Sequence, residues 1–106
     1  MADSAAIVTK WSGPQPPGET AIRRRLDDEG LRPYRWSNGP GDVYSAHTHP
    51  YHKVIYVVLG SITFALPGQG RSLTLHAGDR LDLPAHVAHS AVVGDAGVAC
   101  LEAHRR

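Results

Sequence analysis

The chain has 106 residues, 42% of them apolar, and eleven Lys and Arg against ten Asp and Glu give a formal net charge of +1. This length and composition predict one soluble globular domain, and the balanced charge argues against a nucleic-acid surface. Cys100 is the single cysteine, which excludes an internal disulfide and a thiolate zinc cage. We expect a cytoplasmic protein with no membrane contact, because neither a secretory leader nor a membrane-length apolar run is recognisable.

The N-terminal part of the chain predicts a strand and a helix. Residues 5–11 indicate a short strand, and a Pro-rich segment after it is typical of a stiff linker. Residues 19–29 predict a helix with a narrow apolar stripe, because Ile22 and Leu26 lie four positions apart and a glycine follows the last turn. We therefore expect residues 1–32 to form a strand and helical extension, with the helix on the outside of the domain.

After this helix, short apolar segments alternate with turns rich in Gly, Pro, Asn and Asp. Short strands are expected at residues 33–36, 43–49, 54–59, 61–66, 72–75, 80–83, 89–93 and 98–103. Many short strands with regular turn signals are typical of an antiparallel sandwich or barrel. The sequence therefore predicts an all-β domain over residues 33–106.

A cluster of histidines is the strongest functional signal. His47, His49 and His52 fall within six residues, and His86 and His89 follow about forty positions later. Side chains alternate between the two faces of a strand, so His47 and His49 point the same way and can bind one metal ion together. A single His-x-His pair is more often surface decoration, but a second pair that folds back onto the first favours a metal site.

Two segments of the chain resemble the paired motifs of the cupin superfamily. The first runs from Gly41 through His47-Thr48-His49 and Lys53 to Gly60, and the second runs from Gly78 through Pro84-Ala85-His86 to His89. The seventeen residues between Gly60 and Gly78 match the spacing in compact members. The chain is therefore similar to small single-domain bacterial cupins.

This resemblance implies a double-stranded β-helix, also called a jelly-roll barrel, whose mouth holds a divalent transition metal such as Fe, Mn, Ni, Zn or Cu. It also implies that His47, His49 and His89 are metal ligands. Where the family usually has a glutamate ligand, this chain has Lys53, and an ammonium group has no lone pair to donate.

The missing glutamate leaves three alternatives. In the first, a bulge or turn near Pro50 lets His52 become the fourth ligand. In the second, three histidines and water bind the metal, and Lys53 holds an anionic substrate. In the third, the metal site has been lost. Because a lysine cation beside a metal dication is repelled, the first is favoured, with His47, His49, His52 and His89 as ligands.

The predicted function follows from such a metal with an open coordination position. It supports a dioxygenase or an isomerase acting on a small polar molecule, and the alternative is a non-catalytic module that binds a small ligand or a metal. The expected partners are a small molecule and a second copy of the chain. The homodimer would form by pairing of the apolar strand at residues 6–8 with a neighbouring barrel.

Overall fold

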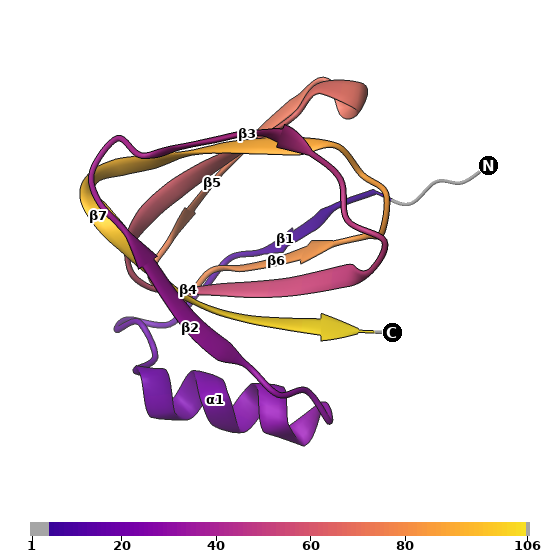
Figure 1. Ribbon diagram of the computed structural model, residues 1–106. Coiled ribbons are helices and arrows are strands. Elements are labelled where there is room, and N and C mark those ends of the chain that lie inside the picture. The colour runs from indigo at the N-terminus through magenta and orange to yellow at the C-terminus, as the bar shows by residue number, and fades with distance from the viewer. Residues whose placement is uncertain (1–4, 106) are drawn as a thin grey trace.

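The protein, described here by a computed structural model of residues 5–105, is a β-barrel with one helix packed on its outside (Figure 1). All strand pairs are antiparallel and belong to one seven-stranded sheet. The elements are β1 (Ile7–Thr9), α1 (Glu19–Asp28), β2 (Tyr34–Asn38), β3 (Val43–His47), β4 (His52–Leu66), η1 (Pro67–Gln69), β5 (Arg71–His76), β6 (Arg80–Leu83) and β7 (His89–Arg105).

The two long strands β4 and β7 pair along most of their length and are shared by two layers. The first half of β4 pairs with β6 and with the end of β7, which also pairs with β2. The second half of β4 pairs with β5 and with the start of β7, which also pairs with β3. The layers β1-β6-β4-β7-β2 and β3-β7-β4-β5 therefore enclose the interior, which confirms the predicted all-β jelly roll.

Glycines at the bends keep each long strand continuous. Gly60 in β4 and Gly97 in β7 both have a φ of +78°. A Cβ atom at Gly60 would collide with the carbonyl group of Gly97, so the two backbones can only meet this closely without a side chain. The pairs of separate strands predicted on either side of these glycines are each one bent strand, because the bend shifts the register without breaking the pairing.

Residues of β4 alternate between two cores. Ile55 and Val57 point into the barrel, whereas Val54, Tyr56 and Val58 belong to a second cluster on the outer face. The second cluster is covered by α1, whose Ile22 and Leu26 are fully buried in it. The predicted exterior helix is therefore confirmed, and its narrow apolar stripe is what attaches it to the barrel.

The N-terminal strand belongs to the same barrel. β1 pairs with β6 along one edge and ends the sheet order, so pairing of its other edge with a neighbouring barrel stays a prediction. Asp79, which is 4% exposed, anchors the segment after β1, because it accepts hydrogen bonds from the Trp11 amide at 2.8 Å and from Lys10 Nζ at 3.0 Å. Within residues 5–105 no helix is long and apolar enough to cross a membrane.

Candidate metal centre

Three of the predicted ligands meet at one end of the barrel. His47 ends β3, His89 begins β7, and these two residues are paired across the strands. His49 follows in the loop after β3. One ring nitrogen from each of the three lies within 4.8 Å of the others. The ring centroids are 4.6 Å apart for His47 and His49, 4.4 Å for His47 and His89, and 5.2 Å for His49 and His89.

Backbone carbonyls orient two of these rings. Nδ1 of His47 lies 2.6 Å from the Ser45 carbonyl oxygen, and Nδ1 of His89 lies 2.9 Å from that of Val87. A carbonyl only accepts, so in both rings Nδ1 carries the proton and Nε2 keeps its lone pair. His89 is 2% exposed, and within residues 5–105 its Nε2 is a buried atom without a hydrogen-bond partner. A metal ion would satisfy this lone pair, so the residues fit the cofactor that the fold implies.

The electrostatics keep two of the three imidazoles, those of His49 and His89, neutral. Burial, together with the positive charge of Lys53 and the neighbouring His47 and His89, lowers the pKa of His49 to about 4. Burial also lowers the pKa of His89. Because only a neutral imidazole can donate to a metal, both side chains are in the binding form near neutral pH.

The fourth predicted ligand, His52, is not part of this cluster. Its Nε2 lies 3.3 Å from Asp82 Oδ1, a residue of the neighbouring strand β6. Lys53 lines the cavity described below, and the adjacent residue on a regular strand faces the opposite side. The bulge or turn that would place His52 beside the other histidines is absent, because β4 is already in regular pairing with β6 at Lys53.

His86 contributes through its backbone. It has a φ of +67°, and its N–H donates a hydrogen bond of 2.7 Å to the carbonyl oxygen of His49. Its side chain is exposed, and it is not one of the three clustered histidines. The backbone of the second motif therefore helps to fix the loop that carries His49 of the first motif.

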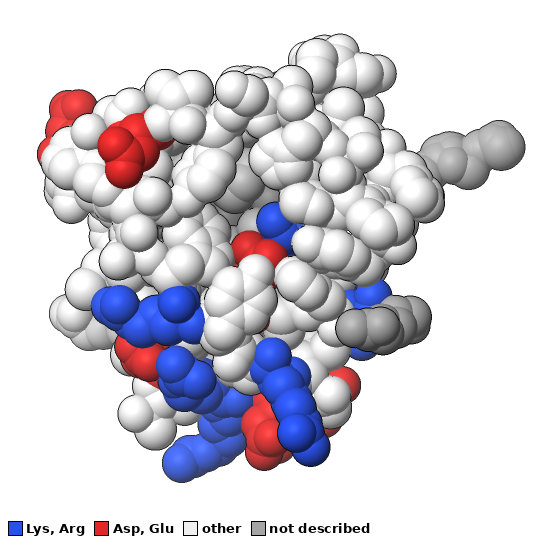
Figure 2. Space-filling view, viewed as in Figure 1, with Lys and Arg blue, Asp and Glu red and all other residues white. Residues whose placement is uncertain are grey.

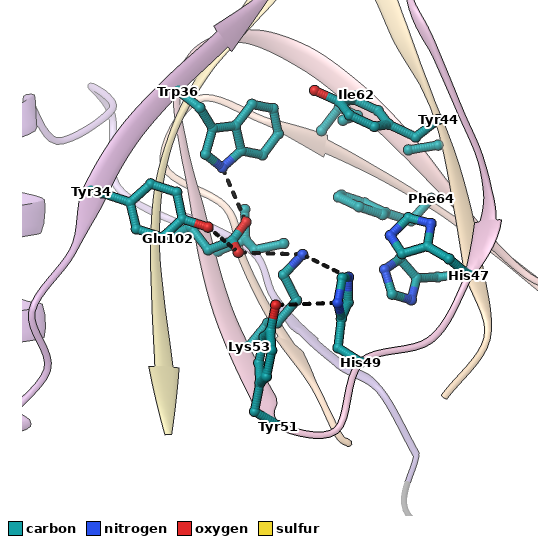
Figure 3. Close-up of a pocket in the computed structure, with 13 residues that line it drawn as sticks. Tyr34, Trp36, Tyr44, His47, His49, Tyr51, Lys53, Ile62, Phe64 and Glu102 are labelled. Atoms are coloured by element: carbon teal, nitrogen blue, oxygen red, sulfur yellow. Dashed lines mark hydrogen bonds and ion pairs between the residues drawn. The ribbon is translucent and has the colours of Figure 1, made fainter. Parts of the chain in front are cut away.

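A cavity of about 300 Å³ opens beside the histidines (Figure 3). It is lined by Tyr34, Trp36, Tyr44, His47, His49, Tyr51, Lys53, Ile55, Ile62, Phe64, His89, Ala91 and Glu102. Lys53 and Glu102 are the charged residues among them. In Figure 2, basic and acidic atoms likewise meet in a hollow at the centre of the face, whereas most other charged side chains on that face lie toward the end that carries α1. The cavity thus combines an aromatic wall with a small charged end.

Glu102 organises the charged end of the cavity. It is 3% exposed and accepts hydrogen bonds from the Tyr34 hydroxyl at 2.6 Å and from Trp36 Nε1 at 3.0 Å. His104 Nε2 lies 2.8 Å and Lys53 Nζ lies 3.3 Å from its Oε2. Burial alone would raise the pKa of Glu102, but the Tyr34 hydrogen bond and the Lys53 charge lower it overall. Glu102 is therefore a carboxylate at neutral pH.

The sequence analysis did not single out this carboxylate or its partners. One signal was available, because Glu102 is a lone acidic residue within the apolar strand predicted at residues 98–103. An acidic side chain inside a barrel must be paired, since an isolated buried charge costs several kcal/mol. Its pairing with Lys53 comes from the register of β4 against β7, which the sequence pattern does not fix.

The comparisons with known proteins agree with this architecture. Residues 34–103 match the model of the cupin domain family. An RmlC-like cupin from Shewanella frigidimarina is 28% identical over 70% of this chain and 64% of its own, with a TM-score of 0.61. KdgF from a Halomonas species is 29% identical over 72% of this chain and 70% of its own, with a TM-score of 0.58.

A more distant neighbour shares the fold alone. The DMSP lyase DddQ from Ruegeria pomeroyi is 24% identical over 72% of this chain, with a TM-score of 0.65, and the match spans 38% of that longer protein. None of the curated proteins compared with the chain matches it. Because the matched segment, residues 34–103, spans well over half of the 106 residues, the chain belongs to the cupin domain family.

Proposed function

We propose that this protein is a metal-dependent enzyme that acts on a small molecule in the cavity, with His47, His49 and His89 as the metal ligands. The observation that carries the proposal is the buried, unpartnered Nε2 of His89, a member of the three-histidine cluster found among residues 5–105. A buried lone pair without a partner costs free energy, and a bound cation removes that cost.

The donor set narrows the choice of metal. Three imidazoles favour Fe, Mn, Ni, Zn or Cu over Mg or Ca, which prefer oxygen ligands. When bound there, the metal would supply a Lewis acid for a substrate oxygen. Glu102 balances the charge of Lys53 at 3.3 Å and so offsets the repulsion between this ammonium and a cation. This supports the second of the three sequence-based alternatives, in which Lys53 belongs to the substrate pocket.

Proton-carrying side chains favour an isomerase over a dioxygenase. The Tyr51 hydroxyl lies 3.2 Å from His49 Nδ1, and Lys53 Nζ lies 3.4 Å from His49 Nε2. Lys53 also contacts Glu102. When His49 binds the metal through one ring nitrogen, Lys53 with its partner Glu102 can still hold and move a proton at Nζ, next to a molecule in the cavity, and isomerisation proceeds by proton transfers of this kind.

Metal binding is the first test. Protein purified without an affinity tag should bind about one equivalent of zinc in a titration monitored by metal analysis, since three imidazoles make one site. His89→Ala and His47→Ala should each lose this binding, whereas the matched control His52→Ala should keep it. Retained zinc affinity in folded His89→Ala protein would contradict the ligand assignment, and loss in His52→Ala would restore the four-histidine set.

The reaction class is tested separately. Small carbonyl compounds incubated with the metal-loaded protein in D₂O should exchange hydrogen beside the carbonyl, as followed by NMR, because a proton-transfer enzyme exchanges protons with solvent. Oxygen uptake without such exchange would indicate the dioxygenase instead.

A non-catalytic binding module is the second candidate. It is favoured by the partners of Glu102, because Tyr34, Trp36 and His104 already engage both of its oxygens and leave it a poor base. A small molecule that binds the metal-loaded protein and is recovered unchanged would support this candidate.

A further inference from the structure

We infer that the cavity selects a small monocarboxylate, whose negative head binds Lys53 beside the metal and whose apolar tail lies on the aromatic wall. This inference rests on the proposed function, because the metal supplies the second positive charge. Lys53 stands where the resemblance places a metal-binding glutamate, and in this inference it selects the ligand.

The ammonium group of Lys53 has capacity for a further acceptor. Its side chain is 12% exposed, and it carries three hydrogens. The contacts of its Nζ within residues 5–105 are Glu102 Oε2 at 3.3 Å and His49 Nε2 at 3.4 Å. In Figure 3 this nitrogen lies inside the cavity, between Glu102 and His49. A buried ammonium is stabilised by every acceptor it gains, so its remaining hydrogen is available to a ligand in the cavity.

The charges of the lining residues favour a single negative charge on that ligand. Lys53 and Glu102 cancel, and Glu102 cannot turn toward a ligand because Tyr34 and Trp36 hold both of its oxygens. The histidines are neutral donors, so a bound dication would leave the cavity with an excess of positive charge. The Lys53 side chain is only 12% exposed, so this excess attracts an anion there more strongly than it would in bulk water.

The wall of the cavity opposite Lys53 indicates which kind of tail the ligand has. Trp36, Tyr44, Ile62 and Phe64 line it, and they offer mostly ring and aliphatic surface. A volume of about 300 Å³ lies at the lower end of the usual range for ligand sites, which limits the tail to a small apolar or aromatic group. A phosphate is disfavoured, because Lys53 is the only Lys or Arg among the described residues that line the cavity, and the wall cannot satisfy several charged oxygens.

Isothermal titration calorimetry with matched ligand pairs tests this inference. Isovalerate, benzoate and phenylacetate would each be compared with the corresponding amide and with inorganic phosphate, on zinc-loaded and on metal-free protein. We expect at least one of the carboxylates to bind the zinc-loaded protein and its amide to bind much more weakly. Lys53→Gln should weaken that binding about tenfold to a hundredfold, the loss typical of a charged hydrogen bond, and Lys53→Arg should lose less. Lys10→Gln, which removes the other lysine of the chain, should bind as the parent does.

The outcomes separate this inference from the proposed metal site. Three results obtained with normal zinc binding would overturn this inference but not the proposed metal site. They are equal affinity for carboxylates and amides, no effect of Lys53→Gln, and phosphate as the preferred ligand. Absence of zinc binding would overturn the proposed function, and carboxylate binding that still depends on Lys53 in the metal-free protein would then retain the role of Lys53. If none of the three carboxylates binds either form, the inference is wrong.

Discussion

The buried pair of Lys53 and Glu102 makes a quantitative prediction about stability. Their side chains are 12% and 4% exposed, and the two charged atoms are 3.3 Å apart. At this distance, and with an effective dielectric constant of about 20, the attraction is roughly 5 kcal/mol before the cost of desolvation is subtracted. Glu102→Gln keeps the shape of the side chain but leaves the ammonium buried without its counter-charge. We expect the free energy of unfolding to fall by about 3 kcal/mol, the lower end of values for breaking a buried pair.

Urea denaturation of the metal-free protein at pH 7, with the slope held constant, measures this loss. The double variant Lys53→Met/Glu102→Gln should be more stable than Glu102→Gln alone, because it removes the uncompensated charge along with its partner. A matched control is Glu19→Gln, whose ion pairs with Arg23 and Arg35 lie on the surface and are worth about 1 kcal/mol or less. The reasoning is refuted if Glu102→Gln lowers the free energy of unfolding no more than Glu19→Gln does. It is also refuted if the losses from Lys53→Met and Glu102→Gln add up to the loss in the double variant.

Three further predictions concern pH, the strand bend and assembly. The metal-free protein should lose stability as pH falls from about 6.5 towards 4, because the unfolded chain takes up a proton at His49 that the folded state excludes. Urea denaturation at several pH values measures this loss, and the His49→Phe variant should show a flatter dependence of stability on pH. Gly60→Ala should destabilise by at least about 2 kcal/mol, since its Cβ would strike the Gly97 carbonyl, whereas Gly68→Ala, with open space around it, should cost far less in the same assay. Sedimentation should show a homodimer joined along β1, because this strand lies at the end of the sheet order. The Val8→Pro variant should sediment as a monomer. A parent protein that sediments as a monomer at every concentration would contradict this prediction.

Local patterns predicted most of the fold. The helix followed from the spacing of Ile22 and Leu26, and most strands followed from turn residues that bound apolar segments. The continuity of β4 and β7 did not follow, because a glycine in a sequence reads as a break, whereas here Gly60 and Gly97 allow two strands to bend together. Whether a glycine ends a strand or bends it depends on what packs against it, and that is decided by tertiary structure.

The sequence predicted those site residues that lie within the two motifs. His47, His49 and His89 lie at the matching motif positions, and the structure brings them together. His52 does not join them, since one step along a strand reverses the face, and the sequence contained no sign that the strand was already regular at Lys53. Glu102 and Tyr34 lie outside both motifs. The register of β7 against β4 brings Glu102 to Lys53, and the register of β2 against β7 places Tyr34 beside Glu102.

The hydrogen bond from Trp36 Nε1 to Glu102 provides an intrinsic optical reporter of the cavity. Indole emission responds to nearby charge and to water, and Trp36 both lines the cavity and lies 3.0 Å from its carboxylate. Trp11, the other tryptophan in the sequence, is bonded instead to the Gln15 carbonyl oxygen and lies under Arg25. In a Trp11→Phe background, fluorescence would therefore follow filling of the cavity in real time, with no label attached to the protein.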